Sequence, residues 1–408
     1  MSNGNGNRLR EGIDWVGYVD WTVRDFHGYD TERGATYNAY LVRDEKTALI
    51  DAVKEPYAAD LLARVAALTD LAAVDYVVVN HAEPDHAGGL PRVLAALPRA
   101  QVVCNAKCRE ALGEHFDTAG WDFHVVATGD ELPLGRRRLR FIDTPMVHWP
   151  ESMFTYVPEE RLLFSMDAFG QHVASTQRYD DELEPGLALA EARTYYANIV
   201  LPYGRQVARA LAAAAELDID MIAPSHGVIW RAGVAGILDA YAGWAAHRPR
   251  PRVVVAYDTM WDSTGRMARA VTEGAAAGGV VAALHHVRHT SHTRLVTEVM
   301  EAAAVAFGSA TLNAGMMPQA AAALTYLKGL RPRNKAAFAF GSYGWGKGGP
   351  EAVDAVLGEM GWERIREPLR VRYRPGEDDL AECRRAGGEL ARRALELVAE
   401  HAGAGRDD

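Results

Sequence analysis

The segment that most constrains this chain spans residues 81–86 and reads HAEPDH, so that two imidazoles and two carboxylates fall within six residues. It directly follows the apolar run YVVV at 76–79, which is typical of a buried strand. A loop that leaves a buried strand is held by a rigid scaffold, so its side chains can be aimed at a common point. The segment therefore indicates a metal site, and a solvated polar loop is the less specific alternative.

Three further ligand-type residues occupy a similar place in the local pattern. His148 follows the apolar segment 139–145, Asp167 follows 162–166 and His226 follows 220–225. Taken singly, Asp167 also suits a turn at a strand end, and His226 a buried histidine whose hydrogen bonds are satisfied. Strand ends that meet at one sheet edge would bring together seven side chains, namely His81, Glu83, Asp85, His86, His148, Asp167 and His226. Four imidazoles and three carboxylates are enough ligands for two metal ions.

This order of residues, H-x-E-x-D-H followed by H, D and H at long spacings, resembles the metallo-β-lactamase-like domain of flavodiiron proteins, also called A-type flavoproteins, which include rubredoxin:oxygen oxidoreductases. The resemblance implies an αββα sandwich with two iron ions. His81, Glu83 and His148 would hold one iron, Asp85, His86 and His226 the other, and Asp167 would bridge them. Hydrolytic relatives usually carry His at the second motif position and bind zinc, whereas Glu83 stands there in this chain. A carboxylate at that position favours iron with open coordination positions.

A second domain is expected to follow the first. At 408 residues, of which 49% are hydrophobic, the chain is long enough for two or three separate cores. The helical pattern of residues 232–244 gives way to alternating Pro and basic residues at 245–252, which predicts a semi-rigid basic linker. We therefore expect domains at 1–249 and 250–408.

The second domain shows three apolar strand candidates, at 253–257, 304–307 and 336–340, each followed by a loop rich in hydroxyl or glycine residues. The first loop, 258–265, leads into a helical pattern, an arrangement that suits a phosphate. The chain contains no G-x-x-x-x-G-K-[ST] motif, which argues against a nucleoside triphosphatase. Binding loops after three successive strands predict a flavodoxin-like, doubly wound parallel sheet within the α/β class. The alternative is an α/β domain with glycine-rich turns and no nucleotide.

The three loops also resemble those of flavodiiron flavodoxin domains, which implies FMN as the ligand. Asp262 departs from what a phosphate requires, so we expect its carboxylate to face solvent. The FMN-binding candidates are Thr259, Met260, Trp261, Asp262, Ser263, Thr264, Ser309, Ala310, Thr311, Leu312, Asn313, Ser342, Tyr343, Gly344, Trp345 and Gly346.

Other features of the sequence indicate in which compartment the protein works and which partners it lacks. Three cysteines without a C-x-x-C pair predict no disulfide framework, and the polar first residues lack an apolar signal core, so we expect a cytoplasmic protein. No apolar stretch is long enough to span a membrane, and the net charge of −10 argues against nucleic-acid binding. The histidines at 285–292 lack an accompanying carboxylate or Cys and are expected mostly at the surface. The basic runs 136–140, 248–252 and 331–335 are solvated faces or docking sites.

Because no C-x-x-C pair for a fused rubredoxin is present, electrons are expected from a separate donor. The resemblance implies a rubredoxin-like protein or a reduced deazaflavin as that donor, and a head-to-tail homodimer or a dimer of such dimers. In that dimer each flavin would serve the iron pair of the other chain.

The sequence thus predicts reduction of O₂ to water, of NO to N₂O, or of both, at a non-haem diiron centre that receives electrons through FMN. One alternative is a zinc-dependent hydrolase with an attached flavin domain, and another is a flavin electron carrier with a degenerate metal domain. Candidates for residues that surround the metal ligands are His27, His172, Trp149 and Tyr195 or Tyr196.

Overall fold

The computed structural model describes residues 7–404, and these divide into two compact units. Among these residues, the first unit comprises 7–196 and 205–242, and the second comprises 197–204 and 243–404. Helix α7 (Val234–Ala245) contains the point where the second unit resumes, at Gly243. The boundary expected after residue 249 lies a few residues beyond that point.

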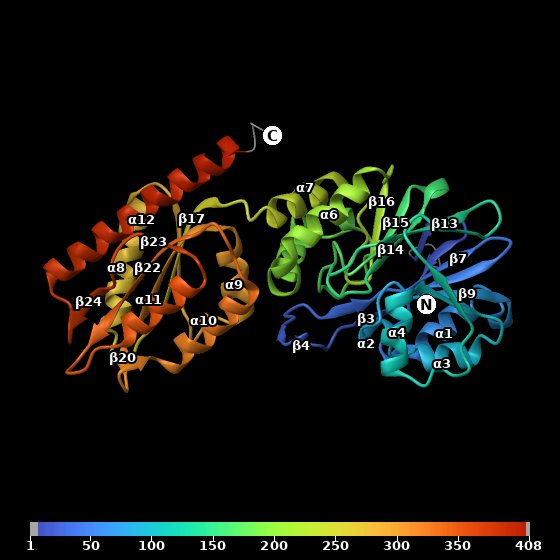
Figure 1. Cartoon of the computed structure of the whole chain (residues 1–408), viewed down its shortest axis with the longest axis horizontal. Coiled ribbons are helices and arrows are strands. Elements are labelled where there is room, and N and C mark those ends of the chain that lie inside the picture. The colour runs from blue at the N-terminus through green and yellow to red at the C-terminus, as the bar shows by residue number, and fades with distance from the viewer. Residues whose placement is uncertain (1–6, 405–408) are drawn as a thin grey trace. The chain divides into compact units, whose positions relative to one another are not determined.

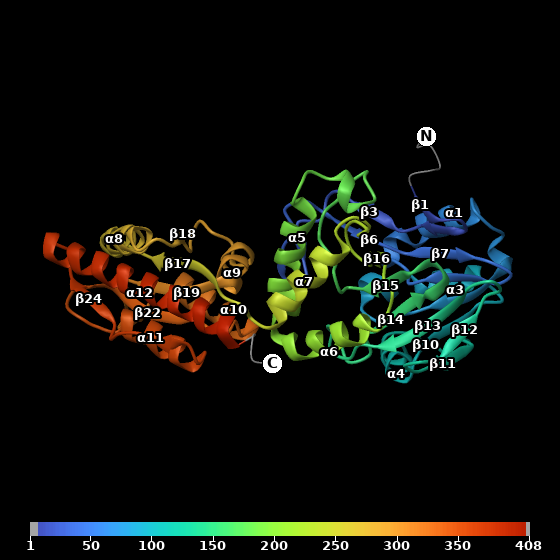
Figure 2. The same cartoon turned by 90° about the horizontal axis from the view of Figure 1, so that it is seen from above.

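The first unit contains two β-sheets that face each other (Figures 1 and 2). The first sheet has the order β1-β2-β7-β8-β9-β10-β11, and its strands β8 to β11 run parallel. The second sheet has the order β12-β13-β14-β15-β16, with only β15 and β16 parallel. The strands are β1 (Arg8–Arg10), β2 (Ile13–Trp15), β7 (Tyr40–Arg43), β8 (Thr47–Ile50), β9 (Val74–Val78), β10 (Gln101–Asn105), β11 (Phe123–Val126), β12 (Glu131–Pro133), β13 (Arg138–Asp143), β14 (Met153–Val157), β15 (Leu162–Met166) and β16 (Met221–Pro224).

Helices cover the outer faces of both sheets and complete the four layers. The sequence of strand β9 is a continuous apolar run because both faces of the strand are buried. Tyr76 and Val78 lie in the core between the sheets, and Val77 lies in the core beneath the helices. Helices α1 (Ala58–Ala66), α3 (Leu90–Ala96) and α4 (Ala106–His115) contribute to that second core. Helices α5 (Leu187–Tyr195), α6 (Gly204–Ala215) and α7 lie on the far side of the second sheet (Figure 1). The predicted αββα sandwich is confirmed.

The second unit is a parallel sheet with the order β18-β17-β19-β22-β23, and β24 also pairs with β22. This is the doubly wound flavodoxin order, as predicted. Helices α8 and α12 pack on one face of the sheet and α9 and α10 on the other (Figure 1). The elements are β17 (Arg250–Asp258), α8 (Ser263–Ala277), β18 (Val281–His286), α9 (His292–Glu301), β19 (Ala302–Ser309), α10 (Pro318–Leu330), β22 (Ala336–Tyr343), α11 (Gly349–Glu359), β23 (Glu363–Arg364), β24 (Leu369–Arg372) and α12 (Glu377–Ala404).

One expectation about this unit was wrong, and another needs refinement. Residues 250–252 are not linker but the start of β17, where Arg250 stands opposite Ala302 and the following irregularity in register accommodates Pro251. The histidine tract lies mostly at the surface, as expected, but His285 on edge strand β18 is buried, at 6% exposure. Its imidazole lies close to the charged side chains of α9, Glu298 among them, and burial lowers its pKa.

The cysteines and the helices agree with the expectations of no disulfide and no membrane span among the described residues. Cys104, Cys108 and Cys383 are all buried free thiols. Within residues 7–404 no helix combines the length and the apolar character needed to cross a bilayer.

Candidate metal centre and flavin pocket

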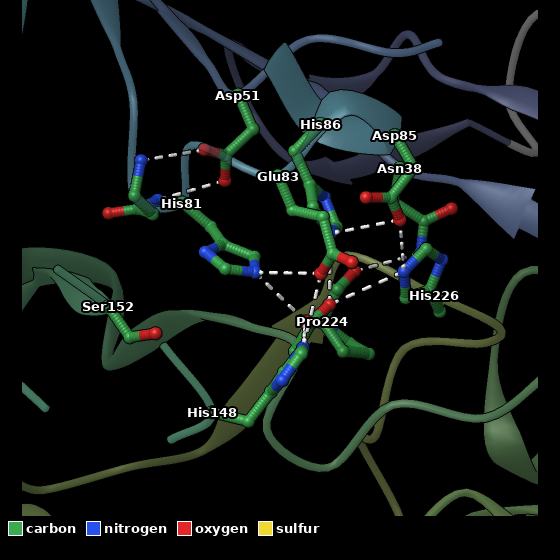
Figure 3. A network of polar contacts seen from close by, with 12 residues as sticks. Asn38, Asp51, His81, Glu83, Asp85, His86, His148, Ser152, Pro224 and His226 are labelled. Atoms are coloured by element: carbon green, nitrogen blue, oxygen red, sulfur yellow. Dashed lines mark hydrogen bonds and ion pairs between the residues drawn. The ribbon is translucent and has the colours of Figure 1, made fainter. Parts of the chain in front are cut away.

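All seven predicted ligands lie in segments that connect strands of the first unit. Figure 3 shows six of them turned toward one another, namely His81, Glu83, Asp85, His86, His148 and His226. His81 and Glu83 follow β9, and Pro84 then begins the short helix α2 (Pro84–Ala87), which carries Asp85 and His86. Proline at the first helical position presets the backbone for this turn. Asp167 directly follows β15, His226 follows β16, and His148 lies between β13 and β14.

The loop after β9 is anchored by a buried polar chain. The backbone N–H of Asn80 donates to Asp51 Oδ1 at 2.7 Å, and its side-chain amide donates to Asp51 Oδ2 at 3.0 Å. Thr155 Oγ1 on β14 donates to Asn80 Oδ1 at 2.7 Å. The start of the metal-binding loop is thereby tied to both sheets.

One ligand set forms around the inner oxygen of Glu83. Its Oε2 lies 3.2 Å from His81 Nε2 and 3.2 Å from His148 Nε2. Asp167 Oδ2 completes the set, at 3.5 Å from His81 Nε2 and 3.0 Å from His148 Nε2.

The second set forms around Asp85. Its Oδ2 lies 3.2 Å from His86 Nε2 and 3.1 Å from His226 Nε2. The other oxygen of Asp167, Oδ1, lies 3.0 Å from His86 Nε2 and 3.3 Å from His226 Nε2. Asp167 therefore presents one oxygen to each set.

These spacings suit ligands that surround a cation. Two atoms each about 2.1 Å from one ion are separated by about 3.0 Å at a right angle and about 3.4 Å at a tetrahedral angle. Despite their proximity, several of these atoms are buried without a hydrogen bond, a group that includes Nε2 of His86, His148 and His226 and both oxygens of Asp85 and Asp167. Leaving so many buried polar atoms unpaired is costly, so the site fits a pair of metal ions.

The electrostatics of the site show strongly coupled opposite charges. Burial opposes the charged form of His81, but its carboxylate neighbours outweigh burial and raise its pKa well above the usual value. Burial likewise opposes ionised Asp167, yet the surrounding imidazoles hold its pKa well below the usual range. For His226 the same balance raises the pKa to about 10. Metal ions would therefore replace protons on these imidazoles.

Two ligands are oriented through their outer ring nitrogens. His81 Nδ1 donates to Glu151 Oε1 at 2.8 Å, and that oxygen also accepts from the backbone N–H of Ala82. His226 Nδ1 donates to the carbonyl oxygen of Thr36 at 2.6 Å. Such bonds fix the tautomer and leave Nε2 available to a metal. Sequence reasoning missed Glu151 and Thr36, although a carboxylate three residues after His148 is a weak signal for the first.

The residues expected to surround the metal ligands do lie beside them. Trp149 presents its ring to His81 with centroids 5.2 Å apart, and His172 lies 4.8 Å from His226. Tyr195 contacts His172, with centroids 5.1 Å apart, whereas Tyr196 packs on Tyr241, so Tyr195 is the tyrosine that faces the site. His27 Nε2 lies 3.0 Å from Glu83 Oε1.

A pocket of about 920 Å³ opens at the carboxyl ends of the strands in the second unit. This volume is in the range of ligand and cofactor sites. Thirteen of the predicted FMN-binding residues line it, namely Met260, Trp261, Asp262, Ser263, Ala310, Thr311, Leu312, Asn313, Ser342, Tyr343, Gly344, Trp345 and Gly346. Sequence reasoning missed four lining residues, namely Arg266 in α8, Ala314, Tyr373 and Arg374. The last two could not be expected, because nothing after β24 marks a binding loop.

Three predicted flavin contacts do not line the pocket. Thr264 Oγ1 lies 3.0 Å from Ser342 Oγ and accepts from the Ser342 N–H, so it joins two of the loops. Ser309 donates to the carbonyl of Ala310, and the Thr259 hydroxyl is buried without a hydrogen bond. These side chains support the pocket wall from behind.

The expected orientation of Asp262 is confirmed. Its side chain is 57% exposed and pairs with Arg269 at 2.6 Å, so the carboxylate is open to solvent although Asp262 also lines the pocket. The indole of Trp261 and that of Trp345 stand open beside the pocket, 87% and 94% exposed.

Comparison with known proteins agrees with this geometry. The family model described as "ODP family beta lactamase" matches residues 35–227, and the flavodoxin model matches residues 255–387. The crystal structure of the flavodiiron protein from Giardia intestinalis is similar with a TM-score of 0.94 and 36% identity, covering 97% of this chain and 98% of that one. The chain belongs to the flavodiiron protein family.

The chain is also similar over nearly its full length to two further proteins. It is 43% identical to a protein named "Nitric oxide reductase" from Moorella thermoacetica, over 94% of this chain and 98% of that one. It is also similar to the rubredoxin oxygen:oxidoreductase from Desulfovibrio gigas, with a TM-score of 0.93 and 37% identity over 96% and 99% of the two chains. In a flavodiiron protein the flavodoxin domain implies a flavin, and the His–carboxylate clusters imply an iron site.

Proposed function

We propose that this flavodiiron protein reduces O₂ to water, NO to N₂O, or both, at a non-haem diiron centre to which FMN relays electrons. The observation that carries the proposal is the position of Asp167. Its Oδ2 lies 3.0 Å from His148 Nε2 and its Oδ1 3.0 Å from His86 Nε2, so a single carboxylate faces two complete ligand sets.

The proposed ligands follow those two sets. His81, Glu83 and His148 would hold one iron, Asp85, His86 and His226 would hold the other, and Asp167, which contacts both sets, would be shared between them. His86 belongs to its set as closely as His226 does, because both imidazoles lie within 3.2 Å of Asp85 Oδ2. Three carboxylates offset most of the charge of two ferrous ions.

When bound, two ferrous ions and reduced FMN supply four electrons, which with four protons convert O₂ to two waters, whereas two NO need two electrons and two protons to give N₂O and one water. The chain's own residues position and shield these groups. Buried rings of Phe26, His172 and Tyr195 surround His226, which limits access of water to that side of the site. The hydroxyl of Tyr195 is buried without a hydrogen bond, and it is the proposed proton donor on this side of the site.

Glu83 separates this proposal from a zinc hydrolase. A carboxylate in place of imidazole adds negative charge and hardens the site, which favours iron with open positions. Metal analysis of the anaerobically purified protein should find two iron and one FMN per chain, and turnover with each gas assigns the substrate preference. Two zinc ions together with hydrolysis of thioesters or lactams would overturn the proposal.

We further propose that the electron donor is a small acidic protein of the rubredoxin type that docks beside the flavin pocket. Two of the basic runs are partly neutralised internally: Arg137 pairs with Glu160 at 2.6 Å, Arg138 with Glu159 at 2.8 Å and Arg250 with Glu301 at 3.1 Å. In the part of the chain that the structure describes, Lys347 and the pocket residue Arg374 make no ion pair, so their charges remain available to an acidic partner.

Salt dependence tests this donor. Reduction of the flavin by rubredoxin should slow steeply as salt rises from about 0.05 to about 0.5 M, because the Debye length falls to a few ångströms. Lys347→Glu should slow it severalfold at low salt only, whereas Arg136→Glu in the exposed basic run serves as the matched control. A flat salt profile would favour an uncharged dock or a small donor such as a reduced deazaflavin.

The remaining proposals concern assembly and compartment. We propose a head-to-tail homodimer, or a dimer of such dimers, in the cytoplasm, with O₂ or NO as the substrate and neither nucleic acid nor membrane as partner. Family membership supports the dimer, and the free state of all three cysteines agrees with a reducing compartment.

A further inference from the structure

The two oxygens of Glu83 face different partners. Oε2 points into the first ligand set, 3.2 Å from the Nε2 atoms of both His81 and His148. Oε1 points away from that set and lies 3.0 Å from His27 Nε2. A carboxylate can bind a metal through one oxygen or through both, and a hydrogen bond to the outer oxygen favours the first mode.

His27 reaches Glu83 from the tip of a two-residue β-hairpin. Strands β4 (Asp25–Phe26) and β5 (Tyr29–Asp30) pair through Phe26 and Tyr29, which leaves His27 and Gly28 as the turn. Both turn residues have positive φ, 54° and 76°, as a type I′ turn requires. Asn, Asp and Gly are the residues such a turn prefers, and histidine is among the other residues that tolerate a positive φ.

The imidazole is turned inward although the turn itself is exposed. Only 16% of the His27 side chain is accessible, and the side chain of Glu83 is accessible to 15%. The neighbouring Phe26 is buried, with its ring 4.7 Å from that of His172 and 5.6 Å from that of His226. The ammonium of Lys54 lies 4.2 Å from the centre of the Phe26 ring. These contacts anchor the hairpin against the metal centre and hold its tip over Glu83.

We propose that His27 is a positioning residue that donates its Nε2–H to Glu83 Oε1 and thereby restricts Glu83 to binding one iron through Oε2 alone. The inference rests on the proposed diiron function. An iron held by His81, Glu83 and His148 would then keep a coordination position for the gas, which a second carboxylate oxygen would otherwise fill.

Asp85 provides the internal contrast. Its Oδ2 faces His86 and His226, as Glu83 Oε2 faces its own imidazoles, but its Oδ1 is buried with no hydrogen-bond donor. Of the two carboxylates that would each bind a single iron, only Glu83 is therefore restrained by a hydrogen bond to its outer oxygen. Two irons held at these sets would be inequivalent for this reason, and an exogenous ligand should bind the iron beside Glu83.

The test compares three substitutions at position 27 in the full, iron- and FMN-loaded protein. His27→Gln keeps an N–H donor at similar reach, His27→Asn suits the turn but has a shorter side chain, and His27→Leu removes the donor. Removing the donor should weaken azide binding to the oxidised centre by about tenfold or more and narrow the infrared splitting of the ¹³C-labelled Glu carboxylates, as expected when a supporting hydrogen bond is lost. The rate of flavin reduction should not change, and His27→Gln should stay close to the parent protein.

The outcomes separate this inference from the function it rests on. A parent protein that holds no iron refutes the proposed function itself. An active parent whose azide affinity and carboxylate splitting are unchanged in His27→Asn and His27→Leu overturns the positioning role alone. X-ray absorption that shows one imidazole fewer on iron in His27→Gln would make His27 a ligand instead. His124→Leu, on the exposed side of β11, controls for the loss of a histidine.

Discussion

Asp167 is the residue on which the two-ion arrangement depends, because it alone presents an oxygen to each ligand set. Asp167→Asn keeps the shape but removes one negative charge and one of the two acceptor oxygens. We expect iron binding and gas reduction to fall by at least about tenfold while FMN stays bound, since bridging ligands and their charge are lost. Iron and flavin per chain are measured after anaerobic purification. Two irons with full turnover in this variant would contradict the bridging role.

Asp70→Asn is the matched control for that substitution. Asp70 caps a short helix in the same unit through a bond from the Ala72 N–H, and asparagine caps helices equally well. Iron content should therefore be unaffected.

Lys335 is a buried lysine outside both sites. It is 3% exposed, and its ammonium group donates to the carbonyl of Met300. Burial lowers its pKa to about 7. An unfolded lysine titrates near about 10.4, so between about pH 7 and 10 the unfolded chain holds a proton that the folded chain lacks, and stability rises with pH.

Lys335→Met removes this dependence. The variant should unfold at a higher urea concentration than the parent at pH 6, and the difference should shrink as the pH approaches 9. Denaturation curves of the full chain at several pH values measure it. A difference that stays constant with pH would show that Lys335 is not neutralised in the folded state.

At the scale of elements, the turn after β16 places His226. Gly227 has a φ of +80°, and a Cβ there would stand 2.1 Å from Gln171 Oε1 and 2.5 Å from the Gln171 carbonyl. Gly227→Ala therefore combines a clash with backbone strain of about 1–3 kcal/mol. We expect His226 to shift and iron content to fall while FMN remains. Gly236→Ala in helix α7, where a Cβ would meet no atom within 4 Å, should leave both unchanged.

The same turn shows what sequence reasoning can and cannot reach. Ligand residues at strand exits could be predicted because period and composition mark strands such as β9 and because parallel strands end at a common edge. The carbonyl of Thr36 that orients His226 could not, because any residue offers a carbonyl and only the fold selects one 190 residues away.

Charge and exposure were harder to predict than position. Arg137 belongs to a run that reads as basic surface, yet it is 2% exposed and paired with Glu160, a contact that depends on how β13 meets the turn before β15. The alternating Pro and Arg of residues 250–252 suggested a linker, although pairing with β19 makes them strand. Such outcomes depend on partners distant in the chain.

At the scale of the whole molecule, two cofactor sites lie in two separately folded units, and electrons must pass from one to the other. Each unit holds the residues proposed for its own group, the seven candidate ligands in the first and the loops around the pocket in the second. Mutations can therefore abolish one function while sparing the other, which makes a complementation experiment feasible.

We expect the flavin and the iron pair that exchange electrons to belong to different chains. A metal-dead variant, His81→Ala with Asp167→Asn, and a flavin-dead variant, altered at Ser263, Thr264 and Ser342, should each be inactive as homodimers. In a mixed head-to-tail dimer, the intact flavin of the first chain faces the intact irons of the second, so one of the two sites can turn over. Activity should then approach about half that of the parent per mixed dimer once mass measurement shows that subunits have exchanged. Confirmed exchange without any return of activity would mean that electrons travel within a chain.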